Sequence, residues 1–208
     1  MYRIVRREYD RRQAPVAELQ AARTEDPFRI LVSAILSART KDETTSEAVR
    51  RLFRVAGTPR ALARLSRARL ERLIFPVGFY HTKAKHLQQL PVEIDRLFGG
   101  RLPETVEELC RLPGVGRKVA SLVVAEAFDK PAICVDVHVH RICNRLGLIR
   151  TRTPLETEMR LRRLLPERYW KTWNPCLVSF GQTICRPIGP KCPVCPLRRY
   201  CDRVGVAR

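Results

Sequence analysis

The sequence of 208 residues lacks any long hydrophobic run, and aromatic residues make up only 7% of it. No segment approaches the roughly 18 consecutive apolar residues that a membrane-spanning helix needs. The first ten residues mix charged and apolar side chains without the apolar segment of a secretion signal. We therefore expect a cytoplasmic protein with no membrane partner. Its length is sufficient for one or two compact domains.

Acidic residues are also scarce, because 21 Asp and Glu stand against 40 Lys and Arg, which gives a formal net charge of +19. Such a field attracts polyanions, of which nucleic acid is the commonest, although a merely soluble basic surface is the alternative. Arginine suits phosphate geometry, but high arginine usage can equally reflect genome composition or growth temperature. The charge thus indicates a class of partner, and with it an association with the nucleoid of a prokaryotic cell.

Apolar residues recur at helical spacing along nearly the whole chain, and no alternation typical of strands is found. Pro, Gly and Cys replace this periodicity from Cys185 onward. The sequence therefore predicts an all-α fold with a small cysteine-rich module at the C-terminus. Helices are expected at 28–36, 42–53 (capped by Asp42), 62–74 (two short helices broken near Ser66), 82–98, 117–128, 137–146, 154–165 and 173–182. Thr105 and Glu108 form a capping-box pattern, which marks a further helix start.

The eight cysteines fall into two groups. Four are flanked by apolar residues and are expected to be free thiols packed in the protein interior: Cys110, Cys134, Cys143 and Cys176. The other four form the pattern C-x6-C-x2-C-x5-C in a proline-rich segment: Cys185, Cys192, Cys195 and Cys201. A segment with so little apolar material needs another source of stability, which four thiolates around a metal centre provide. The pattern favours a metal centre over disulfides in a reducing compartment, and a 4Fe–4S cluster over zinc, which usually takes two short Cys pairs.

A glycine-containing turn lies within Leu112–Ala120. This segment has the form of a helix–hairpin–helix, in which the absence of side chains at Gly114 and Gly116 lets backbone N–H groups approach an anion. A DNA phosphate bound there would position the protein without reading base sequence. The alternative is an ordinary tight turn, and the strong positive charge favours the phosphate site.

Lys118 follows directly in the first turn of the expected helix, where a further phosphate contact is its simplest role. The helix N-terminus and nearby cations disfavour the ammonium form, so they lower the lysine pKa from its usual value of about 10.4. Desolvation in a pocket would act in the same direction. A neutral lysine amine can attack a sugar C1′ and form a Schiff base, which makes Lys118 a candidate nucleophile.

Asp136 is placed to cap the helix expected at 137–146, and capping alone would explain it. The amide N–H groups that it accepts from would hold the carboxylate ionised. Such a carboxylate could stabilise the oxocarbenium character of a sugar that is losing its base, and then move protons. Because a nearby Asp would raise the pKa of Lys118, its role would be to support the sugar cation more than to activate the amine.

These segments, in this order, resemble the endonuclease III branch of the helix–hairpin–helix (HhH-GPD) DNA glycosylase superfamily. The joint occurrence of the hairpin lysine, the downstream aspartate and the four-cysteine pattern is highly specific. The resemblance covers about residues 20 to 203. The segments that carry it are Leu36-Ser37-Ala38-Arg39-Thr40-Lys41-Asp42, Val77-Gly78-Phe79-Tyr80-His81-Thr82-Lys83-Ala84, Leu112 to Ala120, Val135-Asp136-Val137-His138 and Cys185 to Cys201.

The resemblance implies a six-helix barrel domain at residues 24–130, with the helix–hairpin–helix at about 109–128, and an iron–sulfur cluster domain made of residues 1–23 and 131–208. It implies a monomer that binds double-stranded DNA carrying a damaged base or an abasic site and flips the damaged nucleotide out. The implied activity is that of a DNA glycosylase and AP lyase acting on oxidised pyrimidines.

The resemblance also implies a role for each site residue. Lys118 corresponds to the Schiff-base nucleophile and Asp136 to the essential carboxylate. Cys185, Cys192, Cys195 and Cys201 correspond to the 4Fe–4S ligands, in a cluster loop at 185–201. The DNA contacts would come from Gly114, Val115, Gly116 and Arg117 of the hairpin and from Arg186 and Lys191 of the cluster loop.

Two residues depart from the family pattern. Arg39 stands where the family usually has Gln, in the loop that fills the gap left by the flipped nucleotide, and it would offer five donors to the orphaned base. Phe79 stands where the family often has Leu, and its ring could stack on neighbouring bases. Both departures bear on the preference for the opposite base. For His140 we expect a surface or packing role.

Two other functions remain as alternatives. A monofunctional mismatch or adenine glycosylase of the same superfamily would usually lack lysine at the hairpin position, so Lys118 favours the bifunctional activity. A non-catalytic iron–sulfur module would grip phosphate through the hairpin and would not release a base.

Overall fold

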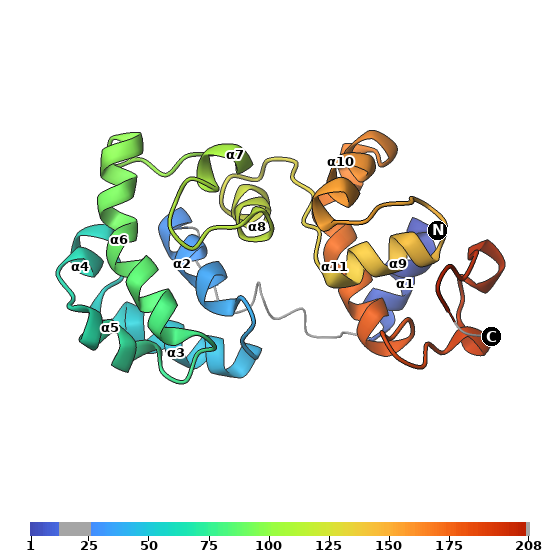
Figure 1. The fold of residues 1–208 in the computed structure, drawn as a ribbon, viewed down its shortest axis with the longest axis horizontal. Coiled ribbons are helices and arrows are strands. Elements are labelled where there is room, and N and C mark those ends of the chain that lie inside the picture. The colour runs from blue at the N-terminus through green and yellow to red at the C-terminus, as the bar shows by residue number, and fades with distance from the viewer. Residues whose placement is uncertain (13–25, 207–208) are drawn as a thin grey trace. The chain divides into compact units, whose positions relative to one another are not determined.

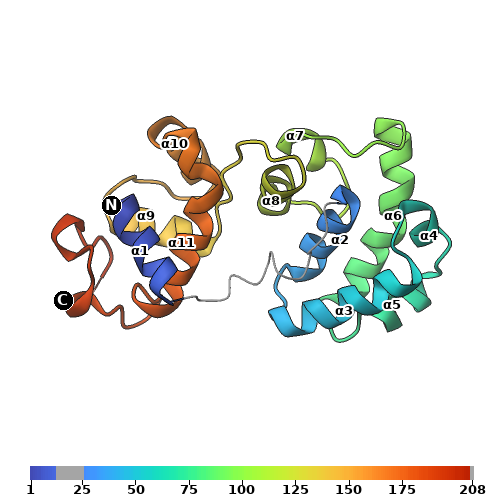
Figure 2. The ribbon, with the colours of Figure 1, turned by 180° about the vertical axis from the view of Figure 1, so that it is seen from behind.

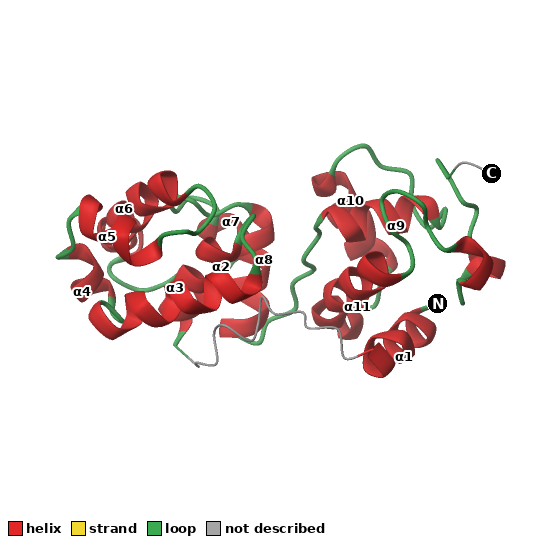
Figure 3. Cartoon of the chain, turned by 90° about the horizontal axis from the view of Figure 1, so that it is seen from below, coloured by secondary structure: helices red, strands yellow, loops and turns green. Residues whose placement is uncertain are grey.

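The computed structural model of the chain describes residues 1–12 and 26–206. These residues form α-helices, turns and three short 3₁₀ helices, with no strand among them (Figures 1 and 3). The all-α fold predicted from the sequence is confirmed. None of the helices in this described part is long and apolar enough to cross a membrane.

The chain divides into two compact units, one made of Ala17–Lys130 and the other of Met1–Val16 with Pro131–Arg208. Residues 1–12 and residues 131–206 therefore belong to the same unit although they lie far apart in the sequence (Figure 2). The boundary expected between residues 23 and 24 lies outside the described residues.

The unit of Ala17–Lys130 is built around α2, which is apolar on nearly every side. Helix α2 packs against α3, α6 and α8, and α6 also packs against α4 and α5. Nine residues of α2 are buried, and among them Leu31, Val32 and Leu36 are fully inaccessible to solvent. A helix that is hydrophobic all round belongs in a core. The helices of this unit are α2 (Pro27–Ser37), α3 (Asp42–Val55), α4 (Pro59–Ala63), α5 (Arg67–Ile74), α6 (Tyr80–Phe98), α7 (Val106–Leu109) and α8 (Arg117–Ala127).

The unit that joins both chain ends is organised around α11. This helix packs against α1 and α9, and α10 packs against α9. Its core is formed by apolar side chains such as Ile142, Trp173, Leu177 and Phe180. The helices of this unit are α1 (Tyr2–Arg12), α9 (Val137–Arg145), α10 (Pro154–Leu164) and α11 (Trp170–Thr183), with 3₁₀ helices η1 (Glu167–Tyr169), η2 (Cys192–Val194) and η3 (Arg198–Tyr200).

Three elements differ from the sequence-based expectation. Helix α1 was not expected, because its charged residues obscure the single apolar face on which Val5 is buried. Asp42 is the first residue of α3, whose N-cap is Lys41, whereas the sequence had suggested Asp42 as the cap. Helix α11 begins at Trp170, three residues before the expected start at Trp173.

Candidate functional site

The hairpin between α7 and α8 has the tight turn that the sequence predicts. Gly114 adopts the left-handed backbone conformation with φ +78°, and a Cβ there would lie 2.7 Å from His86 Nδ1. Gly116 is the N-cap of α8 in ordinary extended conformation, and a Cβ there would meet no atom within 4 Å. Both glycines are exposed, whereas Val115 between them is buried. The turn thus presents the N-terminus of α8 to solvent, where an anion can approach its amides.

Lys118 lies half-buried in the first turn of α8, and this first turn contains no acidic residue. Its chain neighbour Arg117 points a guanidinium at the carboxylate of Glu107, with Nη2 3.3 Å from Oε1. The expected placement of Lys118 at a helix N-terminus, next to a cation, is confirmed. The positive end of the helix dipole acts on this position.

Asp136 is the N-cap of α9, as expected. Its Oδ1 accepts hydrogen bonds from the backbone N–H groups of His138 and Val139, both at 2.9 Å. The side chain is half-buried, and the next residue, Val137, is 68% exposed. Two backbone amide donors thus fix the orientation of this carboxylate. Its second oxygen keeps acceptor capacity for other chemistry.

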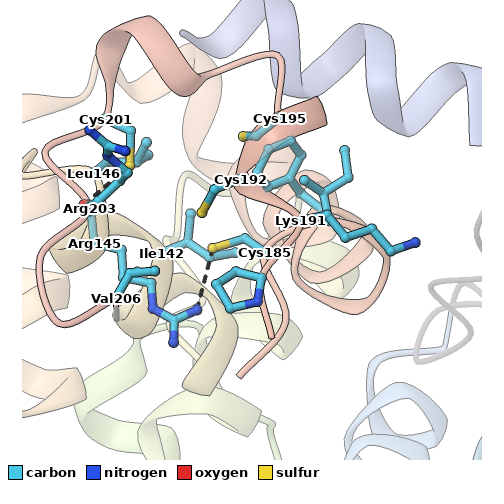
Figure 4. Close-up of a pocket in the computed structure, with 13 residues that line it drawn as sticks. Ile142, Arg145, Leu146, Cys185, Lys191, Cys192, Cys195, Cys201, Arg203 and Val206 are labelled. Atoms are coloured by element: carbon cyan, nitrogen blue, oxygen red, sulfur yellow. Dashed lines mark hydrogen bonds between the residues drawn. The ribbon is translucent and has the colours of Figure 1, made fainter. Parts of the chain in front are cut away.

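The four cysteines of the C-x6-C-x2-C-x5-C pattern line one pocket, and their sulfur atoms face its interior (Figure 4). Arg145 contacts two of them, because its Nη1 donates to Cys185 Sγ at 3.7 Å and its carbonyl accepts from Cys201 Sγ at 3.3 Å. Burial raises the pKa of Cys195 and of Cys201, and the neighbouring thiols add to both shifts. The fourth member, Cys192, lies at the start of η2. The sequence pattern thus brings four thiols around one space.

Zinc and an iron–sulfur cluster place different demands on the four sulfurs around this space. Within the described ranges, no three His, Cys, Asp or Glu side chains are grouped so that they could hold one metal ion. Zinc would require sulfurs about 4 Å apart, since each Zn–S bond is about 2.3 Å long and the geometry is tetrahedral. Apolar side chains of α9 and α11, among them Ile142 and Phe180, also line this space.

Two arginines of α9, which the sequence reasoning missed, organise the segment between the first two cysteines. Arg145 donates to the carbonyls of Arg186 at 2.6 Å and Pro187 at 2.8 Å. Arg141 donates to the carbonyl of Cys185 at 2.9 Å. The side chains of Arg186 and Lys191 are exposed. The backbone from Cys185 to Pro187 is therefore held against α9, while the charges of Arg186 and Lys191 remain available to a ligand.

The other four cysteines form no disulfide. Cys134, Cys143 and Cys176 are buried, as expected, whereas Cys110 is half-buried. Burial raises the pKa of Cys143 to about 12 and that of Cys176 to about 11, so both remain protonated thiols at neutral pH.

Arg39 and Phe79 come together although they lie forty residues apart in the sequence. The guanidinium carbon of Arg39 lies 5.6 Å from the centroid of the Phe79 ring, within cation–π range. Both side chains are exposed, Phe79 by 62%. Each residue adopts the left-handed conformation, with φ 56° and 59°. The two turns thus present one cationic and one aromatic group side by side.

His140 has a structural role. Its Nδ1 lies 2.7 Å from Oγ1 of Thr157, which is fully buried on α10. Thr157 in turn lies 2.6 Å from the hydroxyl of Thr151. His140 therefore belongs to a polar contact between α9 and α10, in agreement with the packing role expected for it.

Residues 32–167 match the family described as "HhH-GPD superfamily base excision DNA repair protein". The chain is 48% identical over 177 residues to Endonuclease III of Thermotoga maritima, which covers 85% of this chain and 83% of that protein. It is 37% identical over 188 residues to Endonuclease III of Bacillus subtilis, which covers 90% of this chain and 85% of that one.

The fold agrees with these sequence relationships. The solved structure described as "Structure of a non-covalent Endonuclease III-DNA Complex" matches with a TM-score of 0.82 and 33% identity, covering 98% of this chain and 96% of that chain. A hairpin lysine at the start of a helix, a capping aspartate and four clustered cysteines accompany the match. The chain belongs to the HhH-GPD superfamily of base excision DNA repair proteins and, within it, to the endonuclease III branch.

Proposed function

We propose that Lys118 and Asp136 carry the reaction of this chain, which is a bifunctional DNA glycosylase and AP lyase of base excision repair. The observation that carries the proposal is the position of Lys118 in the first turn of α8, directly after the hairpin glycines. A lysine amine at a helix N-terminus loses its proton more easily than one in water, and only the neutral amine is a nucleophile.

In this proposal the Nζ lone pair of Lys118 forms a bond to C1′ of an extruded nucleotide, and the glycosidic bond breaks with its electrons leaving on the base. Opening of the C1′–O4′ bond then gives a protonated Schiff base. Removal of a proton from C2′ expels the 3′ phosphate, which is the β-elimination of an AP lyase. Hydrolysis of the imine releases Lys118.

Asp136 would stabilise the positive charge that builds up on the sugar as the base departs. Its Oδ1 is held by two α9 amides at 2.9 Å, so the carboxylate is fixed in position before the substrate arrives. A preorganised charge of this kind acts where the transition state develops the opposite charge. The same carboxylate can afterwards accept and return protons.

Duplex DNA would be held through its phosphates and through the gap left by the flipped nucleotide. The backbone of Gly114 and Gly116 and the first turn of α8 offer N–H donors to phosphate, and Arg117 adds a cation. Val115 would support the turn between them, because its own N–H donates to the carbonyl of Leu112 at 3.2 Å. Arg186 and Lys191 contribute two further exposed cations. The exposed pair of Arg39 and Phe79 would enter the gap, with Arg39 donating to the orphaned base and Phe79 stacking on a neighbour.

The pocket of four thiols would hold a 4Fe–4S cluster through Cys185, Cys192, Cys195 and Cys201. The observation that supports this fit is that the four sulfurs surround one space. The cluster would supply structural cross-links and would take no part in base removal. With it bound, the segment from Arg186 to Lys191 is fixed at both ends.

The substrate class in this proposal is oxidised or ring-saturated pyrimidines in double-stranded DNA, together with abasic sites. We propose that the protein acts as a monomer, in the cytoplasm and associated with the nucleoid of a prokaryotic cell. The barrel domain that the family implies corresponds to residues 24–130, and the cluster domain to residues 1–23 with 131–208.

Borohydride trapping tests the chemistry, because borohydride reduces the protonated Schiff base to a stable amine that links protein to DNA. The wild-type protein should form this adduct with a duplex that carries a ring-saturated pyrimidine. Lys118→Gln should form none. A wild-type protein that gives no adduct, or a variant that gives as much as wild type, contradicts the proposed role of Lys118.

The same duplexes separate the alternative functions. A monofunctional glycosylase would release the base without nicking the strand or forming the adduct, and a non-catalytic module would bind the damaged duplex and change nothing. Varying the opposite base in this panel measures the preference to which Arg39 and Phe79 contribute.

A further inference from the structure

A buried lysine lies behind the exposed pair of Arg39 and Phe79. Lys83 is only 7% exposed, although it lies on α6 just one turn after Phe79. Its Nζ donates to the carbonyl oxygens of Leu36 at 2.8 Å and Ala38 at 2.6 Å. Lys83 thus reaches from the start of α6 to the end of α2.

A third hydrogen bond extends the same contact beyond the helix. Lys83 Nζ lies 3.1 Å from Oγ1 of Thr40, which follows Arg39 in the turn after α2. Carbonyls at a helix C-terminus lack partners within the helix and carry partial negative charge, so they suit a cation. Lys83 therefore caps α2 and continues into the turn that carries Arg39.

The buried position of this charge needs a reason, since a buried ammonium costs free energy unless its donors are satisfied. Desolvation lowers the pKa of Lys83 to about 8. All three of its hydrogen-bond partners are neutral oxygens, so none of them cancels the charge. A neutral side chain would avoid this cost. What the lysine supplies instead is a set of hydrogen bonds that joins α6 to the end of α2 and to the turn after it.

The turn that carries Arg39 is also tied directly to the turn that carries Phe79. The Oγ1 of Thr40 accepts from the backbone N–H of Gly78 at 3.1 Å. A Cβ on Gly78 would lie 2.5 Å from the carbonyl oxygen of Arg39, which shows how closely the two backbones approach. The Thr40 hydroxyl thus receives one hydrogen bond from Lys83 and one from the neighbouring turn.

Both exposed residues are held in a backbone conformation that L-amino acids avoid. Arg39 and Phe79 have φ of 56° and 59°, and such residues persist only where the surroundings determine them. Lys83 contacts the turns on which both residues lie. Its backbone N–H donates to the carbonyl of Phe79 at 3.0 Å, and its side chain donates to Ala38 and Thr40 on either side of Arg39. One residue therefore links the two strained turns.

We propose that Lys83, together with the hydroxyl of Thr40, is a positioning element that holds Arg39 and Phe79 side by side as a preformed wedge. The inference rests on the proposed entry of that pair into the DNA base stack. A wedge that is already assembled does not have to be ordered when DNA binds, which favours binding. Lys83 itself is buried and acts through the two turns.

The test uses one abasic strand in two forms, single-stranded and in duplex, and measures the rate of borohydride trapping. Schiff-base chemistry is common to both forms, whereas only the duplex has a base stack and an orphaned base for the wedge. Lys83→Met keeps the length of the side chain and removes its donors and charge. Trapping on duplex should slow on the order of tenfold to a hundredfold, the effect of a shift of about 1 Å. Trapping on the single strand should stay within about twofold.

Three further variants make the result specific. Lys85→Met removes the same charge from an exposed position on the same helix, and it should leave both rates unchanged. Thr40→Val removes the shared hydroxyl with little change of volume, and it should slow duplex trapping as Lys83→Met does. Thr40→Ser keeps the hydroxyl and should restore the duplex rate. The Thr40 pair carries the test if Lys83→Met does not fold.

Two outcomes would overturn the inference while the proposed function stands. The first is duplex trapping by Lys83→Met and Thr40→Val at the wild-type rate. The second is an equal loss on single strand and duplex, which would indicate general damage to the unit. A wild-type protein that traps neither form overturns the proposed function, and the inference with it.

Discussion

Two alanine substitutions, made one at a time at Gly114 and Gly116, separate the conformational role of the hairpin from its role in binding phosphate. Gly114 has φ +78°, where an alanine costs roughly 1–2 kcal/mol. The added methyl would also lie 2.7 Å from Nδ1 and 3.1 Å from Cβ of His86. The ring of His86 can turn away, but its Cβ moves only with α6, and such overpacking typically costs about 1–3 kcal/mol.

Gly114→Ala should therefore lower the free energy of unfolding by about 2–5 kcal/mol. Gly116→Ala should lower it by less than about 1 kcal/mol, because the backbone at Gly116 is extended and a methyl there meets no atom within 4 Å. Urea unfolding followed by circular dichroism measures both values on the same protein.

Gly116→Ala should lower the affinity for DNA although the variant protein is nearly as stable as wild type. A methyl at Gly116 stands where a phosphate would approach the amides of α8, and a hydrogen bond to a charged group contributes about 1.5–3 kcal/mol. We expect about a tenfold loss in affinity for duplex DNA, measured by fluorescence anisotropy at one fixed salt concentration. Equal destabilisation by both variants would refute the conformational argument, and unchanged binding by Gly116→Ala would refute the phosphate site.

Three further predictions concern single residues. Asp136→Asn should retain salt-dependent DNA binding and nearly wild-type stability, because an amide oxygen can still accept from the α9 amides. The variant should lose base release, and a nicking assay that finds normal release would contradict this. Burial lowers the pKa of Lys83 to about 8 from 10.5, so between these pH values the unfolded chain binds more protons than the folded one. The stability of wild type relative to Lys83→Met should therefore rise with pH by up to about 3 kcal/mol. If urea titrations from pH 7 to 10 give the same stability difference between the two proteins at every pH, the shift is refuted. Cys192→Ser should lose iron and acid-labile sulfide, whereas Cys110→Ser should keep both, as chemical analysis of each can decide.

Elements with strong local signals were predictable from the sequence. Helix α6 ends at Phe98 because Gly99 follows in the left-handed conformation, with φ 59°. Helix α9 begins after Asp136 because its carboxylate accepts from two amides of the first turn. Each signal involves residues within a few positions of each other, so it can be recognised without knowing what the helix packs against.

Features that depend on distant parts of the chain were not predictable in this way. Helix α1 packs on α11, and the hydroxyl of Tyr2 lies 2.7 Å from that of Thr172. Arg145 reaches Cys185 and the two following carbonyls across forty residues. In sequence, Lys83 is one basic residue among 40, and its burial follows only from its contact with the end of α2. Side-chain roles of this kind require the three-dimensional structure.

The central claim is that the amine of Lys118 forms the covalent bond to the sugar. The most direct test is to trap the wild-type protein on abasic duplex DNA with borohydride, digest the adduct and locate the modified residue by mass spectrometry. We predict that the deoxyribose remnant is attached to Nζ of Lys118. Attachment to another lysine or to the N-terminal amine, with Lys118 unmodified, would contradict the account.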